Sequence, residues 1–163
     1  MEKREKKRRG LPPLVSKYDK YGVVWKRLEN VDHELLGYLL SCHLVIEHYI
    51  DNFLSTNIST ELSWKTARLS FSQKVELLSG TNIFEPPYDF VSSIAHLNKL
   101  RNRYAHDIET KLLTKDLKPL YESILEMTDG KGEEPNDPYQ ILEVFTLFVC
   151  AWFGGAISIA SKN

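Results

Sequence analysis

Apolar residues recur at every third or fourth position between residues 32 and 54, and this spacing constrains the fold more than any other feature of the chain. The recurring residues are Leu35, Leu39, Cys42, Ile46, Tyr49 and Phe53, and the stripe is widened by Leu36, Leu40, Leu44 and Ile50. Residues three and four apart lie on one face of an α-helix, so the segment predicts a long amphipathic helix. Asp32 is a suitable N-cap, and the polar stretch at 55–60 ends the pattern.

Four further segments have helical spacing. The second helix is expected to begin near Ser70 or Ser72 and to end at Gly80, and the third covers about 89–106, after the rigid Glu85-Pro86-Pro87. The fourth and fifth cover about 115–128 and 139–160. We find no alternating β-strand pattern of any length, so the expected fold is an all-α bundle of about five helices. A chain of 163 residues fits one such domain, spanning 14–163.

Residues 1–13 differ in composition from the rest of the chain. Six of the first nine residues are Lys or Arg, opposed only by Glu2 and Glu5, and Gly10-Leu11-Pro12-Pro13 follows. Such a segment resists burial and predicts a mobile basic tail; the alternative is a loose electrostatic arm for RNA that weakens with salt. The formal net charge of the whole chain is −1, so the body without this tail is acidic. A globally basic nucleic-acid binder is therefore not indicated.

The two cysteines and the start of the chain bear on the cellular compartment. Cys42 and Cys150 lie far apart in the sequence and match no metal spacing, which is typical of small apolar residues in a reducing compartment. No apolar run follows the charged N-terminus, so we expect no secretory signal and a cytoplasmic protein.

The last expected helix is unusually apolar, since no charged residue occurs between Val144 and Ala160. A transmembrane helix needs roughly 20 apolar residues, but no basic cluster flanks this segment, and we expect no membrane partner. One alternative is a helix at the centre of the bundle. Another is a helix shared between the core and a subunit interface, because Ala151 and Gly155 are four apart and would admit a second helix closely.

The stretch from Leu100 to Asp107 combines two arginines, an amide and a histidine at the end of the third helix. Asn102 and His106 share a helix face, as do Arg103 and Asp107, which predicts a modest surface ion pair. Arg101 instead continues the apolar stripe and needs an acceptor, for which Glu47 on the first long helix is the candidate. The Arg101–Glu47 pair is either a buried structural clamp or a device that orients Arg101 toward a cleft.

Other chemical signatures are absent from the sequence. No His, Cys or carboxylate grouping has convincing metal spacing, and no glycine loop for phosphate or nucleophile motif occurs. His43 and His48 are expected to be helix-surface or packing residues. We therefore expect no metal and no cofactor.

Arg101-Asn102-Arg103-Tyr104-Ala105-His106 resembles the signature of HEPN domains (higher eukaryotes and prokaryotes nucleotide-binding), in which Arg, a polar residue, a short spacer and His follow in that order. The long early helix with its interior Glu47, the Phe71-Ser-x-Lys74 helix and the apolar last helix are similar as well, so that the resemblance covers about 32–160. It implies a dimeric helical bundle that acts as a metal-independent endoribonuclease, often a toxin or defence effector with a cognate antitoxin.

The resemblance also implies roles for individual residues. Arg101 and His106 would form the catalytic pair, and Asn102 would orient His106 or bind the phosphate. The neighbouring basic residues Arg103 and Lys99 are our own candidates for RNA contacts. A toxin subgroup carries Tyr two residues after the His, where this chain has Ile108. Mannitol-operon regulators are similar in size and layout, so that a catalytically inactive regulatory or binding module, taking a protein or nucleotide partner, is the alternative.

Overall fold

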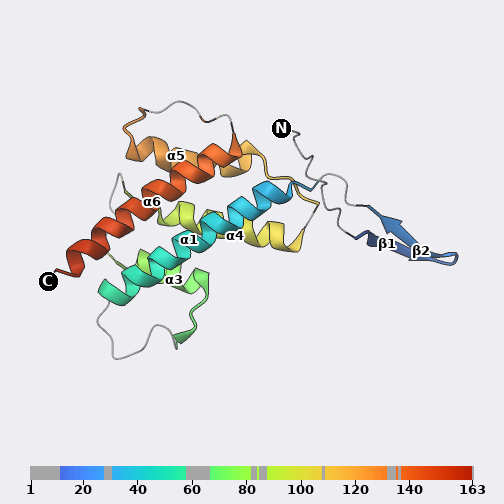
Figure 1. Cartoon of the computed structure of the whole chain (residues 1–163), viewed down its shortest axis with the longest axis horizontal. Helices are drawn as coiled ribbons and strands as arrows, with labels where there is room; N and C mark the ends of the chain where they lie inside the picture. The colour runs from blue at the N-terminus through green and yellow to red at the C-terminus, as the bar shows by residue number, and fades with distance from the viewer. Residues whose placement is uncertain are drawn as a thin grey trace, which may run out of the picture.

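The computed structural model describes residues 12–27, 31–57, 67–81, 84, 88–107, 109–131, 135 and 137–162. Its helices form a bundle, as the apolar spacing predicts (Figure 1). The elements of the bundle are α1 (His33–Asn57), α3 (Phe71–Ser79), α4 (Val91–His106), the short 3-10 helix η1 (Thr114–Leu117), α5 (Lys118–Met127) and α6 (Pro138–Ala160). The mainly helical fold class is therefore confirmed.

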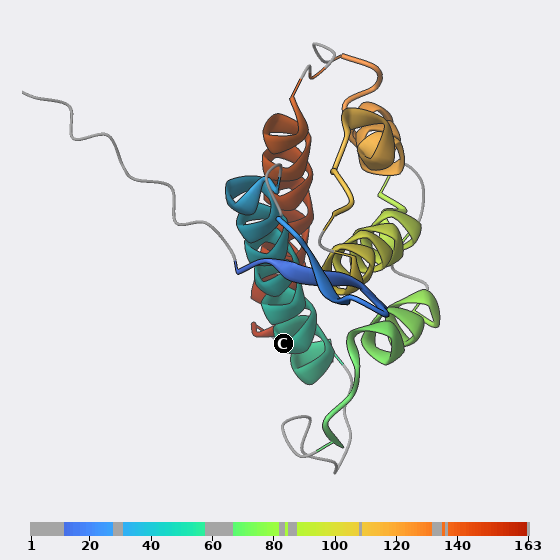
Figure 2. The ribbon, with the colours of Figure 1, turned by 90° about the vertical axis from the view of Figure 1, so that its right-hand side faces the viewer.

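The bundle has two layers. The long helices α1 and α6 lie side by side, and α3, α4 and α5 cover one side of them (Figure 2). The core between the layers is centred on a cluster of aromatic side chains with ring centroids 4.7–6.2 Å apart, made up of Phe53, Phe84, Phe90, Trp152 and Phe153. These rings come from both layers, so their burial holds the layers together.

Local capping groups explain where the helices begin and end. An oxygen of Asp32 accepts a hydrogen bond of 3.0 Å from the amide of Leu35, at the start of α1. Ser70 and Gln73 form a reciprocal capping box at the start of α3, and Gly80 follows its last residue. The start of α1 and the two ends of α3 agree with the sequence prediction, because each capping residue stands next to the helix end that it caps.

The expectation of no β-strand was wrong. Strands β1 (Leu14–Asp19) and β2 (Gly22–Lys26) pair antiparallel in a hairpin that projects from the bundle (Figure 1). Gly22 adopts a positive φ of 123° next to the turn, a conformation that favours glycine. Valines and aromatic residues favour the extended chain here. Of the predicted tail at 1–13, residues 1–11 lie outside the described residues, and Pro12 and Pro13 are exposed.

The last helix, α6, is neither enclosed by the described bundle nor wholly exposed. Its buried residues recur along one face and are Ile141, Leu142, Phe145, Val149 and Phe153. Leu147 on the opposite face is exposed, as is Ile159 in the last turn, so the helix is not the centre of the described bundle. By length and composition alone α6 could cross a membrane. In the packed pair of α1 and α6, Cys42 of α1 is buried and Cys150 of α6 is half-buried.

Candidate functional site

The predicted motif occupies the last turns of α4. A guanidinium nitrogen (Nη1) of Arg101 donates a hydrogen bond of 2.8 Å to Oδ1 of Asn102, and both side chains are half-buried. His106 is the last residue of α4 and is exposed. Asn102 and His106 are four residues apart in one continuous helix and therefore share a side of it. The motif thus combines a fixed cation with an accessible imidazole at a helix end.

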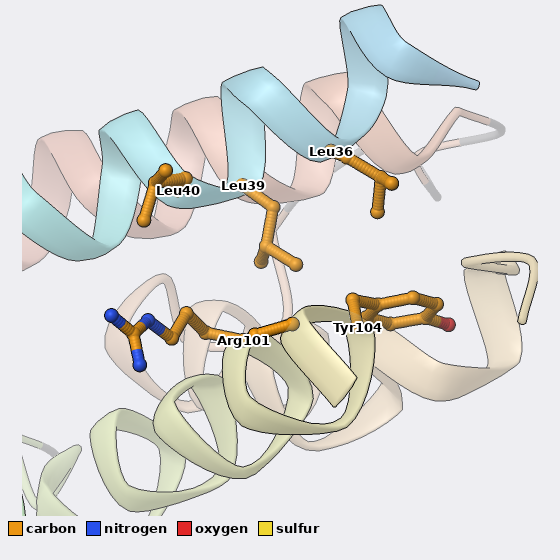
Figure 3. Close-up of a pocket in the computed structure, with 6 residues that line it drawn as sticks. Leu36, Leu39, Leu40, Arg101 and Tyr104 are labelled. Atoms are coloured by element: carbon orange, nitrogen blue, oxygen red, sulfur yellow. The ribbon is translucent and has the colours of Figure 1, made fainter. Parts of the chain in front are cut away.

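A pocket of about 210 Å³ lies between α1 and α4 beside this motif (Figure 3). Its lining is mostly apolar and consists of Leu36, Leu39, Leu40, Arg101, Tyr104 and Ala105. In Figure 3 the side chain of Arg101 runs along α4 beneath Leu39 and Leu40, while Tyr104 extends in the opposite direction. Arg101 is the charged residue of this lining, so an anionic group is the ligand that it favours.

The predicted Glu47–Arg101 ion pair is not formed. Oε1 of Glu47 instead accepts from Nζ of Lys74 at 2.7 Å, and Lys74 also contacts a carboxylate oxygen of Asp51 at 2.7 Å. Among the described residues, no carboxylate lies within 4.0 Å of the Arg101 guanidinium. The helical spacing correctly predicted that Glu47 lies on an inward-facing side of α1. That side contacts α3, however, where Lys74 is the partner of Glu47. Glu47 therefore supports the α1–α3 contact and not the orientation of Arg101.

The side chain of Lys74, which contacts the carboxylates of Glu47 and Asp51, is only 12% exposed. Burial by itself would lower the pKa of Lys74, but the hydrogen bonds to Asp51 and Glu47 outweigh burial and raise the pKa. The charged form of Lys74 is therefore favoured in the folded protein.

A double-mutant cycle with Glu47→Gln and Lys74→Met should give a coupling free energy of about 1–2 kcal/mol in urea unfolding, between the values for exposed and buried pairs. The matched cycle of Glu47→Gln with Arg101→Met should give less than about 0.5 kcal/mol, because these side chains do not pair. If the coupling free energy of Glu47 with Arg101 exceeded that of Glu47 with Lys74, the Glu47–Arg101 pair predicted from the sequence would be correct after all.

A buried polar network lies one turn before the motif and was missed by the sequence reasoning. Nε2 of His43 and Oδ1 of Asn98 are 3.1 Å apart, and Nδ2 of Asn98 donates to Oγ of Ser72 at 3.2 Å. The ring of His43 also stacks on Phe71, with centroids 4.1 Å apart. This network joins α1, α3 and α4 just before Arg101.

Burial lowers the pKa of His43, and the hydrogen bond to Asn98 offsets this only in part. The unfolded chain, with a histidine pKa of about 6.5, therefore takes up the proton first as the pH falls. The stabilising effect of neutral His43 is complete above that pH and is lost progressively below it.

Acidification from pH 7 to pH 5 should therefore lower the free energy of unfolding, with His43 contributing at most about 1.4 kcal/mol per pH unit. Urea unfolding at several pH values measures this slope. His43→Gln should flatten it, whereas replacement of the exposed His48 by glutamine should not. Equal slopes in the wild type and His43→Gln would disprove the assignment.

The remaining basic residues of α4 have different surroundings. Nη2 of Arg103 contacts a carboxylate oxygen of Asp116 at 3.1 Å and donates to the Tyr104 hydroxyl at 2.7 Å. Asp107 instead accepts from the loop that follows it, so the predicted Arg103–Asp107 pair is not formed. Lys99 is exposed on α4, and Ile108 lies outside the described residues. Arg103 therefore ties the end of α4 to η1, while Lys99 remains accessible.

Within the described ranges, no three His, Cys, Asp or Glu side chains are grouped closely enough to hold a metal ion. The candidate site therefore consists of Arg101, which lines the groove, and of Asn102 and His106, which belong to the same helix end but are not part of the groove lining. No family model, curated protein or solved structure matches this chain.

Proposed function

We propose that the protein is a metal-independent endoribonuclease of HEPN type that acts at the α1–α4 groove. The observation that carries this proposal is the state of Arg101, whose side chain lines the groove and whose guanidinium is held by Asn102 and has no carboxylate within 4.0 Å among the described residues. A guanidinium held in this way is ready to take a phosphate oxygen. The exposed His106 on the same helix supplies a group that can move a proton.

The chemistry needs one proton acceptor, one proton donor and one cation. His106 takes the proton of a ribose 2′-hydroxyl, and the 2′-oxygen then attacks the adjacent phosphorus. The bond from phosphorus to the 5′-oxygen breaks, and this leaving oxygen receives a proton from a second imidazole or from water. Arg101 neutralises the charge that develops on the non-bridging oxygens. The products carry a 2′,3′-cyclic phosphate and a 5′-hydroxyl.

A second copy of the chain would supply that second imidazole. Leu40 lines the groove and is 42% exposed, and Leu44, one turn further along α1, is also exposed. Apolar side chains next to a guanidinium favour coverage by another protein surface. We therefore propose a homodimer whose seam includes this groove, in the manner of a toxin or defence effector held in check by a cognate antitoxin.

The second candidate is a catalytically silent regulatory module in the cytoplasm. The apolar lining of the groove favours it, because three leucines and Ala105 around one cation suit a peptide or nucleotide ligand as well as an RNA backbone. In that case Arg101 would anchor an anionic group of the ligand and His106 would have no part in chemistry.

The two candidates differ in the products that they form from RNA. Purified protein is incubated with mixed RNA substrates in excess chelator, and the termini of the products are identified by mass spectrometry. Chelator-resistant cleavage that leaves 2′,3′-cyclic phosphates supports the enzyme. Cleavage that is equal in the wild type and in the motif variants would show contamination and would favour the regulatory module. Light scattering that gives a monomer at micromolar concentration would contradict the shared cleft.

A further inference from the structure

The hairpin formed by β1 and β2 carries exposed aromatic residues that no part of the described bundle covers. Tyr18 is 78% exposed, Tyr21 in the turn 86% and Trp25 61%. The strand register pairs Tyr18 with Val23 and Val15 with Trp25. Paired residues lie on the same face of a sheet and alternate residues share a face, so Tyr18, Val23, Trp25 and Val15 form one aromatic and apolar face.

The hairpin also carries basic residues. Lys17 and Lys26 belong to the other face of the hairpin, Lys20 lies in the turn and Arg27 follows β2. Residues 12–27 contain four Lys or Arg and one Asp, a formal charge of +3, and residues 1–11 add a formal charge of +4 to the sequence. The other 136 residues contain eleven Lys or Arg and nineteen Asp or Glu, a formal charge of −8. A polyanion is therefore attracted to the hairpin and repelled by most of the bundle.

The hairpin is also anchored beside the motif. Nζ of Lys26, the last residue of β2, contacts Oε2 of Glu109 at 2.7 Å. Glu109 lies three residues after His106, in the loop that follows α4. The views in Figures 1 and 2 place the hairpin at the end of the bundle where α1 begins and α4 ends. The hairpin therefore lies next to the loop that follows the candidate site.

We propose that the hairpin Leu14–Lys26 and the adjoining Arg27 form a binding site for single-stranded RNA. Bases stack on Tyr18 and Trp25, and Lys20 and Arg27 contact the phosphates. Stacking of this kind needs the open faces of unpaired bases, which a duplex does not offer. The basic residues favour RNA over a protein partner for the same aromatic face. The delivery of this RNA to His106 rests on the proposed function, but the binding itself does not.

Binding is tested in a His106→Ala background, so that no RNA is cleaved during the measurement. Fluorescence anisotropy follows a labelled 12-nucleotide RNA and the same sequence as a duplex. Tyr18→Ala and Trp25→Ala should each weaken single-strand binding roughly tenfold, the effect of one lost stacking contact. Tyr88→Ala is the matched control, because Tyr88 is an exposed aromatic residue of the bundle (47%) and its loss should leave the affinity unchanged.

Two further variants guard against a hairpin that no longer folds. Trp25→Phe keeps an aromatic residue suited to a strand and should bind within about threefold of its parent. Lys20→Gln combined with Arg27→Gln leaves the aromatic face intact. It should reduce the slope of log K against log salt by about 1.4, as expected for two lost contacts with single-stranded phosphates.

Unchanged affinity in Tyr18→Ala and Trp25→Ala would overturn the proposal, as would duplex binding as tight as single-strand binding. Absence of any RNA binding would also overturn it and would leave the aromatic face to a protein partner. Binding that weakens as expected, together with a wild type that does not cleave RNA, would refute the proposed ribonuclease and leave the hairpin site standing. Cleavage that needs His106, together with an RNA affinity that no hairpin variant changes, would refute the hairpin site and leave the proposed ribonuclease standing.

Discussion

Replacement of His106 by alanine should lower the rate of RNA cleavage by about 100-fold or more, because a positioned general acid or base typically contributes roughly 10²–10⁴-fold. Arg101→Ala should cost about as much, since loss of one group that stabilises developing charge lowers kcat by roughly 10²–10³-fold. Single-turnover cleavage of a defined RNA in the presence of chelator measures both effects. Asn102→Ala should have a smaller effect, because it removes the acceptor that holds Arg101 but not the guanidinium itself.

The controls separate chemistry from folding. His106 is exposed at the end of α4, so its loss should change the free energy of unfolding by less than about 1 kcal/mol. His48→Ala removes another exposed imidazole, on α1, and should leave cleavage unchanged. If His106→Ala and His48→Ala both retain wild-type activity, the motif is not the catalytic centre.

Phe53→Ala should destabilise the fold by about 3–5 kcal/mol, the usual cost of removing a buried phenylalanine. Phe53 is fully buried, and its ring lies 5.2 Å from that of Phe153 and 5.9 Å from that of Trp152, measured between centroids. Truncation leaves a cavity between the two layers, which the surrounding rings can fill only in part. Urea unfolding followed by far-UV circular dichroism measures the loss.

Phe148→Ala is the matched control on α6. Phe148 is 36% exposed, so that its removal deletes less buried surface and should cost under about 1.5 kcal/mol. A loss below 1 kcal/mol for Phe53→Ala, or equal losses for the two variants, would show that the aromatic cluster does not hold the layers together.

The helices were predictable because their signals are local. Asp32, Ser70 and Gly80 stand next to the backbone groups that they satisfy, so spacing and capping together locate the ends of α1 and α3. The fourth predicted segment is divided into η1 and α5, and this division has no equally clear signal. Pro119 in the first turn of α5 is compatible with either arrangement.

The hairpin escaped prediction because it lacks the alternation on which strand recognition depends. All residues of β1 and β2 are exposed, so no face of the hairpin needs to be purely apolar. Val23 and Val24 are adjacent and point to opposite faces, and an irregularity between Val15 and Lys17 shifts the register. The β-branched and aromatic residues around Gly22 were the remaining signal.

The sequence located the motif but not its neighbours. Helical spacing shows which side of a helix a residue occupies, and this correctly put Asn102 and His106 on one side of α4. It does not show which helix packs there, so Glu47 was assigned to Arg101 when its partner is Lys74. The contact of His43 with Asn98 joins residues 55 positions apart and likewise depends on how α1 and α4 pack.

The two cysteines make the α1–α6 pair observable without any engineered probe. Burial raises the pKa of Cys42, and it raises the pKa of Cys150 to about 11. Alkylating reagents attack the thiolate, so both side chains react slowly at neutral pH while the two helices are packed. Separation of the helices restores ordinary thiol reactivity. The rate of alkylation at low denaturant therefore reports how often this seam opens, and its comparison with global unfolding distinguishes local breathing from complete loss of the fold.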